Sequence, residues 1–232
     1  MTQPLFRDDP YLTTASATVA GTGDGTLILD RSVFYPAGGG QPGDIGHLET
    51  EDGTTIAVTD ARYTEDRSAI ALSVDTVLAP GTAVTQHLDW PRRYNIMRMH
   101  TALHLLSVAL PYPVTGGQIG ATDSRLDFDI PDATLDKDAI AAAVQALIDA
   151  DHKVSTEWIT DAELDAKPDL VKTMAVKPPR GSGKVRLVRI GDIDLQPCGG
   201  THVAATSEIG RIDVKKIEKK GRQNRRVRIA LA

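Results

Sequence analysis

Short alternating patterns of apolar and polar residues run through the first third of the chain. Five runs rich in β-branched residues are separated by Gly, Pro and Asp clusters, which is typical of strands joined by turns. They cover residues 26–30, 44–49, 54–60, 68–75 and 82–89. Regular short strands with little helix predict a small barrel or sandwich that ends at about residue 88.

Helical periodicity appears directly after this unit. Residues 91–110 predict a helix with Pro91 in its first turn and Pro111 ending it. Apolar residues recur on more than one face, so we expect this helix to be well buried. An amphipathic helix is predicted over residues 135–150, with Thr134 as its cap. Its apolar stripe consists of Ile140, Val144, Leu147 and Ile148.

Strand patterns return between and after the two helices. They cover residues 125–130, 153–159 and 184–196, and a Pro- and Gly-rich connection crosses 167–184. The chain then reads as a hairpin with its turn around Gly221. In the last strand, apolar residues alternate with arginines, so one face should be buried and the other should present guanidinium groups. These residues are Val227, Ile229 and Leu231 against Arg226 and Arg228. The pattern predicts an α+β unit over residues 89–232.

Composition excludes several classes of protein. The chain has 232 residues, is 41% hydrophobic and 25% charged, and carries a net charge of −5, as expected of a folded globular protein. One Cys cannot form an internal disulfide, no apolar stretch approaches a membrane span, and no signal peptide is recognisable. We therefore expect a cytoplasmic protein. The mild acidity argues weakly against a nucleic-acid partner.

The distribution of charge changes that last inference. Residues 211–228 contain nine basic and two acidic residues, a net charge of +7, which leaves −12 for the rest of the chain. Such asymmetry points to a local anionic partner. The alternative is a solvated sheet edge, since lysines protect exposed edges from pairing.

Two short motifs carry the most specific chemistry. His100 and His104 stand at i and i+4 on the first predicted helix, so both imidazoles project from one face. Cys198 and His202 flank a flexible Gly199–Gly200 pair. Together the motifs supply three nitrogens and one sulfur, a set that suits Zn²⁺. The 94 positions between His104 and Cys198 are too many for a zinc finger, so the tertiary fold must assemble the site.

Other readings of these histidines are weaker. Thr101 stands where a helical metalloprotease motif has its Glu base, which excludes that class. His47, His87 and His152 lack partner spacing and are interpreted as structural or surface residues.

Two glycine-rich segments remain. Residues 34–46 contain Gly38, Gly39 and Gly40, which allow close backbone approach to a ligand, followed by Gln41. No Lys-Ser/Thr and no helix follows, so the segment is not a phosphate-binding loop. The second, 115–120, includes Gln118. Each by itself reads as a turn.

Taken in order, these segments resemble the AlaX-type alanyl-tRNA editing proteins, free-standing relatives of the editing domain of alanyl-tRNA synthetase. The resemblance rests on FYPAGGGQPGDIG, RMHTALHLLSVAL, TGGQIG with SRLDFD, IGDIDLQPCGGTHV and the terminal hairpin, and covers most of residues 26–230. It implies an N-terminal β-barrel (residues 1–88) followed by a zinc-binding, two-layer α+β editing domain (residues 89–232). The implied activity is zinc-dependent hydrolysis in trans of tRNA for alanine mischarged with Ser or Gly.

The resemblance also implies roles for individual residues. One Zn²⁺ per chain would be held by His100, His104, Cys198 and His202. Gln41 is expected near the editing pocket, with Thr101 as a second catalytic candidate. Substrate-binding candidates are Gly39, Gly40, Gln118, Gly199, Gly200 and Thr201. The candidates for contact with tRNA phosphates are Lys215, Lys216, Lys219, Lys220, Arg222, Arg225 and Arg226.

The role of the metal stays open at this stage. Four protein ligands are the pattern of a structural site, whereas catalytic zinc sites keep a position open. One ligand could bind weakly, zinc could accept a fifth ligand, or the metal could only position the substrate. The alternatives from other classes are a non-catalytic RNA-binding module with structural zinc, and a zinc hydrolase of small esters or amides.

Overall fold

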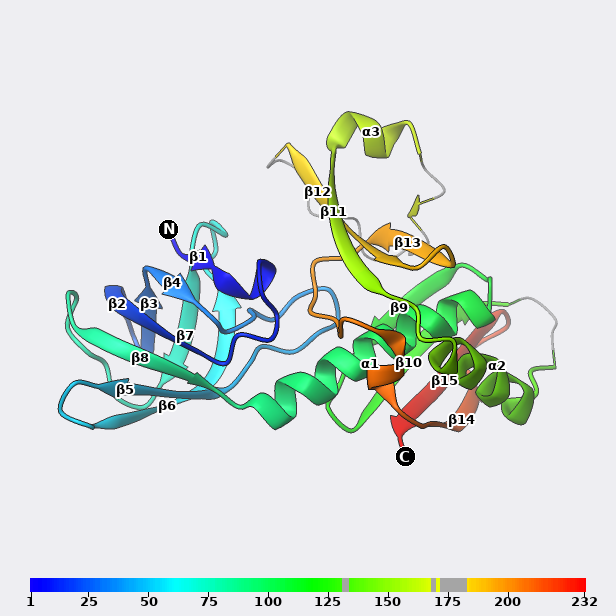
Figure 1. Ribbon diagram of the computed structural model, residues 1–232, viewed down its shortest axis with the longest axis horizontal. Helices are drawn as coiled ribbons and strands as arrows, with labels where there is room; N and C mark the ends of the chain where they lie inside the picture. Colours follow the sequence, from blue (N-terminus) through cyan, green and yellow to red (C-terminus); the bar gives the residue numbers. More distant parts are fainter. Residues whose placement is uncertain (131–133, 168–169, 172–182) are drawn as a thin grey trace. The chain divides into compact units, whose positions relative to one another are not determined.

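The computed structural model describes residues 1–130, 134–167, 170–171 and 183–232. It consists of two compact units, Met1–Tyr94 and Asn95–Ala232. Figure 1 follows the order of the elements along the chain. A closed barrel, further antiparallel sheets and packed helices confirm the predicted α+β fold class.

The first unit is built around a closed six-stranded antiparallel barrel, in the order β2-β3-β7-β6-β5-β8. Alternate residues point into it: in β7, Ile70, Leu72 and Val74 are buried while their neighbours are not. This period-2 burial is the reason the sequence pattern identified the strands. The barrel strands are β2 (Thr14–Gly23), β3 (Thr26–Leu29), β5 (Gly46–Thr50), β6 (Thr55–Tyr63), β7 (Ile70–Val74) and β8 (Ala83–Leu88).

Short elements complete this unit. Strands β1 (Gln3–Pro4) and β4 (Arg31–Ser32) pair in parallel, and a 3₁₀ turn, η1 (Leu5–Arg7), buries Phe6 against the barrel core. Strand β2 lacks a clear apolar alternation in its outer half, and the sequence pattern missed it.

The first glycine-rich segment forms a tight turn, as its pattern indicates. Gly38 and Gln41 exchange two backbone hydrogen bonds of 3.0 Å. Gly39 and Gly40 between them have φ values of +61° and +85°, the left-handed region that favours glycine. The turn therefore requires small residues at these positions whatever else they do. Gln41 is only 2% exposed.

A buried ion pair closes the barrel unit. The Arg93 guanidinium is fully buried and bonds the Asp44 carboxylate, whose second partner is the Tyr35 backbone N–H. Arg93 also donates to the carbonyls of Pro10 and Val33. These bonds compensate the positive charge of Arg93, which would otherwise be costly to bury. They also connect the segment before the glycine-rich turn to the start of α1 (Trp90–Ala109).

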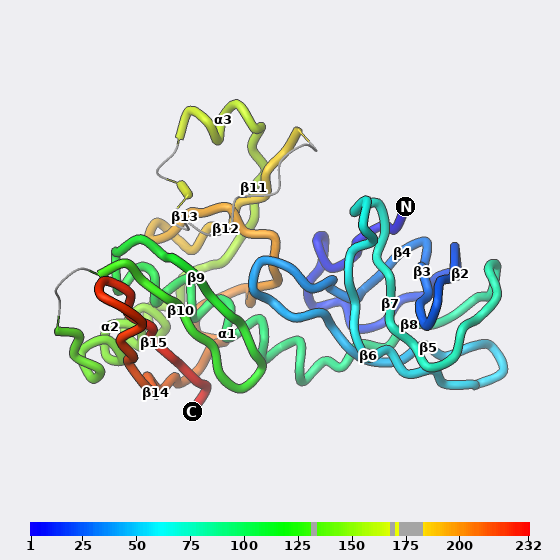
Figure 2. Tube along the Cα trace, turned by 180° about the vertical axis from the view of Figure 1, so that it is seen from behind, coloured from blue at the N-terminus to red at the C-terminus, as the bar shows by residue number. Residues whose placement is uncertain are grey.

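Helix α1 is buried on several sides in the second unit, as predicted. Met97, Met99, Ala102, Leu105 and Leu106 are all inaccessible to solvent. The second unit also contains a four-stranded antiparallel sheet in the order β14-β15-β10-β9. Figure 2 shows the last strand, β15, beside β10, although the two lie about 100 residues apart in sequence. The strands are β9 (Val114–Gln118), β10 (Asp123–Asp129), β14 (Ile212–Lys219) and β15 (Asn224–Leu231).

The amphipathic helix α2 (Lys137–Asp149) packs against β14. Ile140, Val144 and Ile148 of its stripe are buried. The predicted cap was wrong: Asp136, not Thr134, caps the helix by accepting from the N–H groups of Asp138 and Ala139. An Asx side chain next to the first turn outcompetes a Thr placed two residues earlier.

A separate three-stranded antiparallel sheet, β11-β12-β13, carries the loop with Cys198. Its strands are β11 (Val154–Thr160), β12 (Lys184–Ile190) and β13 (Asp194–Pro197). One face packs a small apolar cluster with the short helix α3 (Asp161–Asp165). A 3₁₀ turn, η3 (Thr206–Ile209), follows the second metal motif.

The second glycine-rich segment is not a turn but strand β9, paired with β10. A Cβ at Gly117 would lie 2.9 Å from the end of the Leu126 side chain, which would have to shift, whereas at Gly116 the nearest atom lies at 3.6 Å. The predicted connection over 167–184 lies mostly outside the described residues. Among the described helices, none is long and apolar enough to span a membrane.

Candidate metal centre

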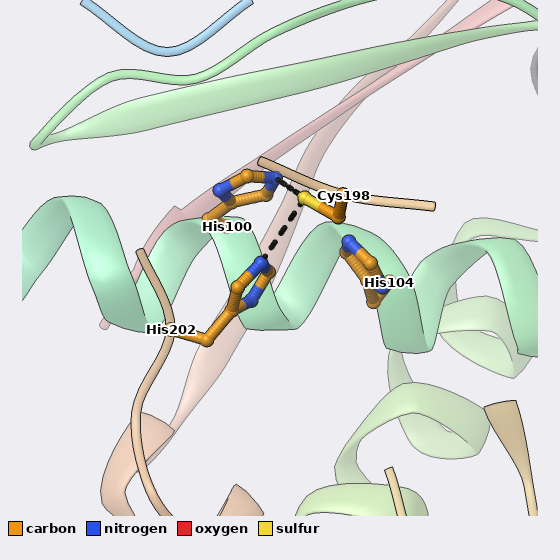
Figure 3. A group of neighbouring side chains, drawn as sticks. All are labelled: His100, His104, Cys198 and His202. Atoms are coloured by element: carbon orange, nitrogen blue, oxygen red, sulfur yellow. Dashed lines mark hydrogen bonds between the residues drawn. The ribbon is translucent and has the colours of Figure 1, made fainter. Parts of the chain in front are cut away.

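Four side chains from two distant segments meet at one point in the second unit. His100 and His104 project from the same face of α1, and Cys198 and His202 come from the loop after β13 (Figure 3). Their nitrogen and sulfur ligand atoms all lie within 4.8 Å of one another. Cys198 Sγ is 3.4 Å from His100 Nε2 and 3.3 Å from His202 Nε2. The i, i+4 spacing and the Cys-x-x-x-His spacing therefore predict this cluster correctly.

Thr101 fixes the orientation of His202. The Thr101 side chain is fully buried, and its hydroxyl donates to the Met97 carbonyl at 2.9 Å. With its proton so committed, Oγ1 accepts the N–H of His202 Nδ1 at 3.1 Å. This arrangement leaves the lone pair of His202 on Nε2, the atom that faces Cys198.

Asp194 does the same for His104. The Asp194 carboxylate lies 3.0 Å from His104 Nδ1 and also accepts from the Gln196 amide at 2.8 Å. A carboxylate behind an imidazole holds the proton on the near nitrogen and frees the far nitrogen for a metal. Both supporting groups are buried, so these orientations are defined by the fold.

Electrostatics favours a thiolate in this cluster. Burial alone would raise the pKa of Cys198, but attraction to the imidazoles of His100 and His202 brings it well below its ordinary value. For His202, burial lowers the pKa well below its ordinary value, and repulsion from His100 lowers it further. For His104, burial opposes protonation, but the Asp194 hydrogen bond raises its pKa to about 9. A metal that bound here would therefore displace a proton from His104.

The loop that carries Cys198 is held by a buried arginine. Arg186 of β12 donates from Nη1 to the carbonyls of Cys198 and Gly200, both at 2.9 Å. The backbone N–H of Cys198 donates to the Arg186 carbonyl at 3.1 Å. Gly199 is exposed while Gly200 is buried. The arginine thus sets the path of the loop at the residue that supplies the sulfur.

The donor set fits zinc. Tetrahedral zinc with bonds of about 2.0–2.3 Å requires ligand atoms roughly 3.3–3.8 Å apart. The two Cys–His separations of 3.3 and 3.4 Å lie in this range. The second ring nitrogens of His104 and His202 each have a buried acceptor, as in metal sites generally. In the described part of the chain, no other group of three or more His, Cys, Asp or Glu side chains is arranged to hold an ion.

The remaining site candidates are spread over both units. Gly39, Gly40 and Gln41 belong to the first unit. Gln118 lies on β9, is exposed and accepts from Arg125 Nε at 3.3 Å. Thr201 is 1% exposed, directly before His202.

Two of the other histidines, His47 and His87, belong to the first unit. The rings of His47 and His87 stack at 4.6 Å across β5 and β8, a register that sequence spacing does not reveal.

The terminal hairpin, residues 211–228, is less uniformly cationic than its sequence suggests. Glu218 forms ion pairs with Lys216, Lys220 and Arg228, and Asp213 pairs with Lys215. Arg226 is held by Asp127 through bonds of 2.7 and 2.8 Å. Lys219 and Arg222 are exposed and form no ion pair with a described residue. Arg225 donates only to backbone carbonyls of its own turn.

Sequence reasoning missed the supporting residues Asp194, Gln196 and Arg186. A weak signal existed: Asp194 and Gln196 alternate on β13, in phase with Cys198 directly after it. Nothing local marks Arg186, because its partners lie 12 and 14 residues away in the loop after β13.

Comparison with known sequences first defines a class. Residues 185–228 match the "Threonyl and Alanyl tRNA synthetase second additional domain", and residues 10–92 match "tRNA synthetases class II (A)". The chain is 34% identical to an alanine–tRNA ligase of Sulfurisphaera tokodaii over 94% of its own length, but covers 25% of that enzyme. It thus resembles about a quarter of an alanyl-tRNA synthetase.

Full-length similarity then defines the family. The chain is 35% identical to the alanyl-tRNA editing protein AlaX-M of Methanosarcina acetivorans, covering 100% of this chain and 99% of the relative. It is 33% identical to AlaX-M of Saccharolobus solfataricus, with 98% of each covered. The chain belongs to the AlaX family.

Proposed function

We propose that this protein is a trans-editing hydrolase that removes Ser, Gly or both from mischarged tRNA for alanine, with zinc as its cofactor. The observation that carries the proposal is the assembly of His100, His104, Cys198 and His202 within 4.8 Å of one another. This cluster occurs in a chain whose full-length relatives are named alanyl-tRNA editing proteins.

His100, His104, Cys198 and His202 would hold the metal. When bound there, Zn²⁺ would supply a Lewis acid that polarises the ester carbonyl. Cys198 is the only partly exposed member of the four, and the others are buried. Substrate would therefore reach the cluster from the side of Cys198 and Gly199, where backbone N–H groups of Gly199 and Gly200 are candidates to stabilise the developing oxyanion.

The two threonines take different parts in this proposal. The Thr101 hydroxyl is engaged by Met97 and His202, so Thr101 positions a ligand rather than reacting itself. Thr201 is the remaining candidate to recognise a seryl hydroxyl. A site that rewards one hydroxyl rejects alanine because a buried polar group would then lose its partner. Gly39 and Gly40 of the first unit and Gln118 of the second are further candidates for substrate binding, and Gln41 is a candidate catalytic residue.

The basic side chains of the hairpin would bind tRNA phosphates. They are Lys215, Lys216, Lys219, Lys220, Arg222, Arg225 and Arg226. Such contacts position the acceptor stem by shape and charge, without reading its sequence. Lys219 and Arg222 are the strongest members of this set, because acids of the described chain do not neutralise them.

The test is a deacylation assay with Ser-tRNA and Gly-tRNA for alanine, using Ala-tRNA as the comparison substrate. We expect the zinc-loaded protein to release Ser or Gly far faster than Ala, and Cys198→Ala to abolish release. Intact acylation together with tight tRNA binding would instead favour an RNA-binding module with structural zinc. Cleavage of small esters without dependence on tRNA would favour a general zinc hydrolase.

A further inference from the structure

An exposed tryptophan lies on the same sheet as the cysteine of the metal cluster. Trp158 is 50% exposed, although large aromatic side chains are normally buried. It lies on β11, the edge strand of the β11-β12-β13 sheet. The apolar cluster of this sheet is built by Ile159, Val185 and Leu187 and lies on the opposite face. Packing of that cluster therefore does not explain the indole.

Strand register aligns Trp158 with the metal cluster. Trp158 pairs directly with Arg186 on β12. The register between β12 and β13, with Leu187 opposite Pro197, continues to Arg186 opposite Cys198, whose N–H donates to the Arg186 carbonyl. Directly paired residues lie on one face. The indole, the guanidinium and the thiol therefore form one cross-strand row, about 10 Å long from its two strand spacings.

The row ends on the accessible side of the cluster. His100, His104 and His202 are buried, whereas Cys198 is partly exposed and Gly199 is exposed. Arg186, between the two ends, directs Nη1 to the carbonyls of Cys198 and Gly200 and so braces the row. A ligand that reaches the metal past Cys198 would have Trp158 beside it.

We propose that Trp158 is the stacking platform for the nucleobase of the 3′-terminal nucleotide of the aminoacyl-tRNA. This inference rests on the proposed function and adds the recognition of the substrate's last base. The ester to be cleaved and that base are joined by a single ribose, so an ester at the cluster and a base at Trp158 would belong to one nucleotide. Unpaired nucleobases bind proteins by stacking on exposed aromatic rings, and an edge-strand indole offers such a ring.

The test is a thermodynamic cycle with two RNA probes. Both are minihelices that carry a non-cleavable 3′-seryl amide; one ends in adenosine and the other in an abasic ribose. We expect Trp158→Ala to weaken binding of the adenosine probe about tenfold, as for loss of one base–aromatic stack. The abasic probe should bind wild type about tenfold more weakly, and Trp158→Ala should not weaken it further. Trp158→Phe should restore most of the affinity for the adenosine probe.

Controls separate stacking from damage to the site. Tyr112→Ala removes another exposed aromatic of the same unit and should bind like wild type. Zinc content of Trp158→Ala should also match wild type. Unchanged affinity in Trp158→Ala, or losses that add between variant and abasic probe, would overturn the stacking role. Failure of wild type to deacylate mischarged tRNA would instead reject the proposed function, while the binding cycle would still report on Trp158.

Discussion

The metal cluster and the terminal hairpin are two collections of polar side chains that the same fold treats differently. In the cluster, the three histidines are buried, and buried side chains orient two of them: Thr101 orients His202, and Asp194 orients His104. In the hairpin, most cations are exposed, and Glu218 alone serves three of them. In the cluster the positions of single atoms are fixed, whereas in the hairpin mainly the net charge of the surface is defined.

This difference shows which sequence signals correctly predict how side chains are arranged in the folded protein. A metal needs particular atoms at one point, so the residue types and their spacing carry the information. A count of charges carries less information about the folded surface, because ion pairing depends on strands that meet only in the tertiary structure. Of the hairpin cations, Arg226 is engaged by Asp127, 99 positions away. The predictions below probe this contrast.

Loss of a metal ligand should have the largest effect. His104→Ala and Cys198→Ala each remove one of four ligands, and we expect bound zinc to fall from about one ion per chain to nearly none after dialysis. Deacylation should be lost with it. Elemental analysis of the dialysed proteins makes the measurement, with His152→Ala as the matched histidine control. Full zinc content in both ligand variants would show that the cluster is not the metal site.

The residues behind the ligands should have the next largest effect. Thr101→Val keeps the shape but removes the acceptor for His202, and Asp194→Asn removes the charge behind His104. Changes to such supporting groups typically weaken metal binding about 10- to 100-fold. Competition with a chromophoric chelator measures this, and Asp192→Asn, an exposed change in the preceding turn, is the control. Wild-type zinc affinity in both variants would contradict the orienting role.

These supporting residues also mark the limit of prediction from sequence. Five of the six barrel strands, the two long helices and the four residues of the candidate metal cluster follow from periodicity and motif spacing, whereas strand β2 does not. Strand β9 does not either, because its glycines mimic a turn, while the crowding of Gly117 by Leu126 arises only when β9 pairs with β10. Asp194 acts through a partner 90 residues distant and has only a weak local signal, and Arg186 acts through a partner 12 residues distant that no local pattern reveals. Local rules find elements and ligands, whereas long-range contacts decide what supports them.

Charge reversal in the hairpin should act on RNA and leave the metal alone. Lys219→Glu with Arg225→Glu should weaken tRNA binding at physiological salt about tenfold or more and flatten its salt dependence. Zinc content should stay at the wild-type level. Binding titrations at several salt concentrations provide the measurement, and Arg62→Glu with Arg67→Glu on the barrel unit is the control. Unchanged tRNA affinity in the hairpin variant would refute its role.

The smallest effect is expected from breaking the ion pair between Asp127 and Arg226 of the hairpin. Asp127 is paired with Arg226 and, at 2.6 Å, with Arg125. Burial alone would raise the pKa of Asp127, but its bonds to Arg226 and Arg125 lower it below its ordinary value. We expect Asp127→Asn to reduce the free energy of unfolding by about 1–3 kcal/mol at pH 7, because it removes the charge from a largely buried network.

The pH dependence gives this prediction its sign. A carboxyl group with a lowered pKa in the folded state stabilises the protein above the unfolded pKa, about 3.9 for Asp, and loses that contribution as pH falls through the folded pKa. The difference between wild type and Asp127→Asn in urea unfolding should therefore be constant above about pH 5 and shrink below about pH 4. A difference that persists unchanged in acid would mean that shape, not charge, couples Asp127 to Arg226.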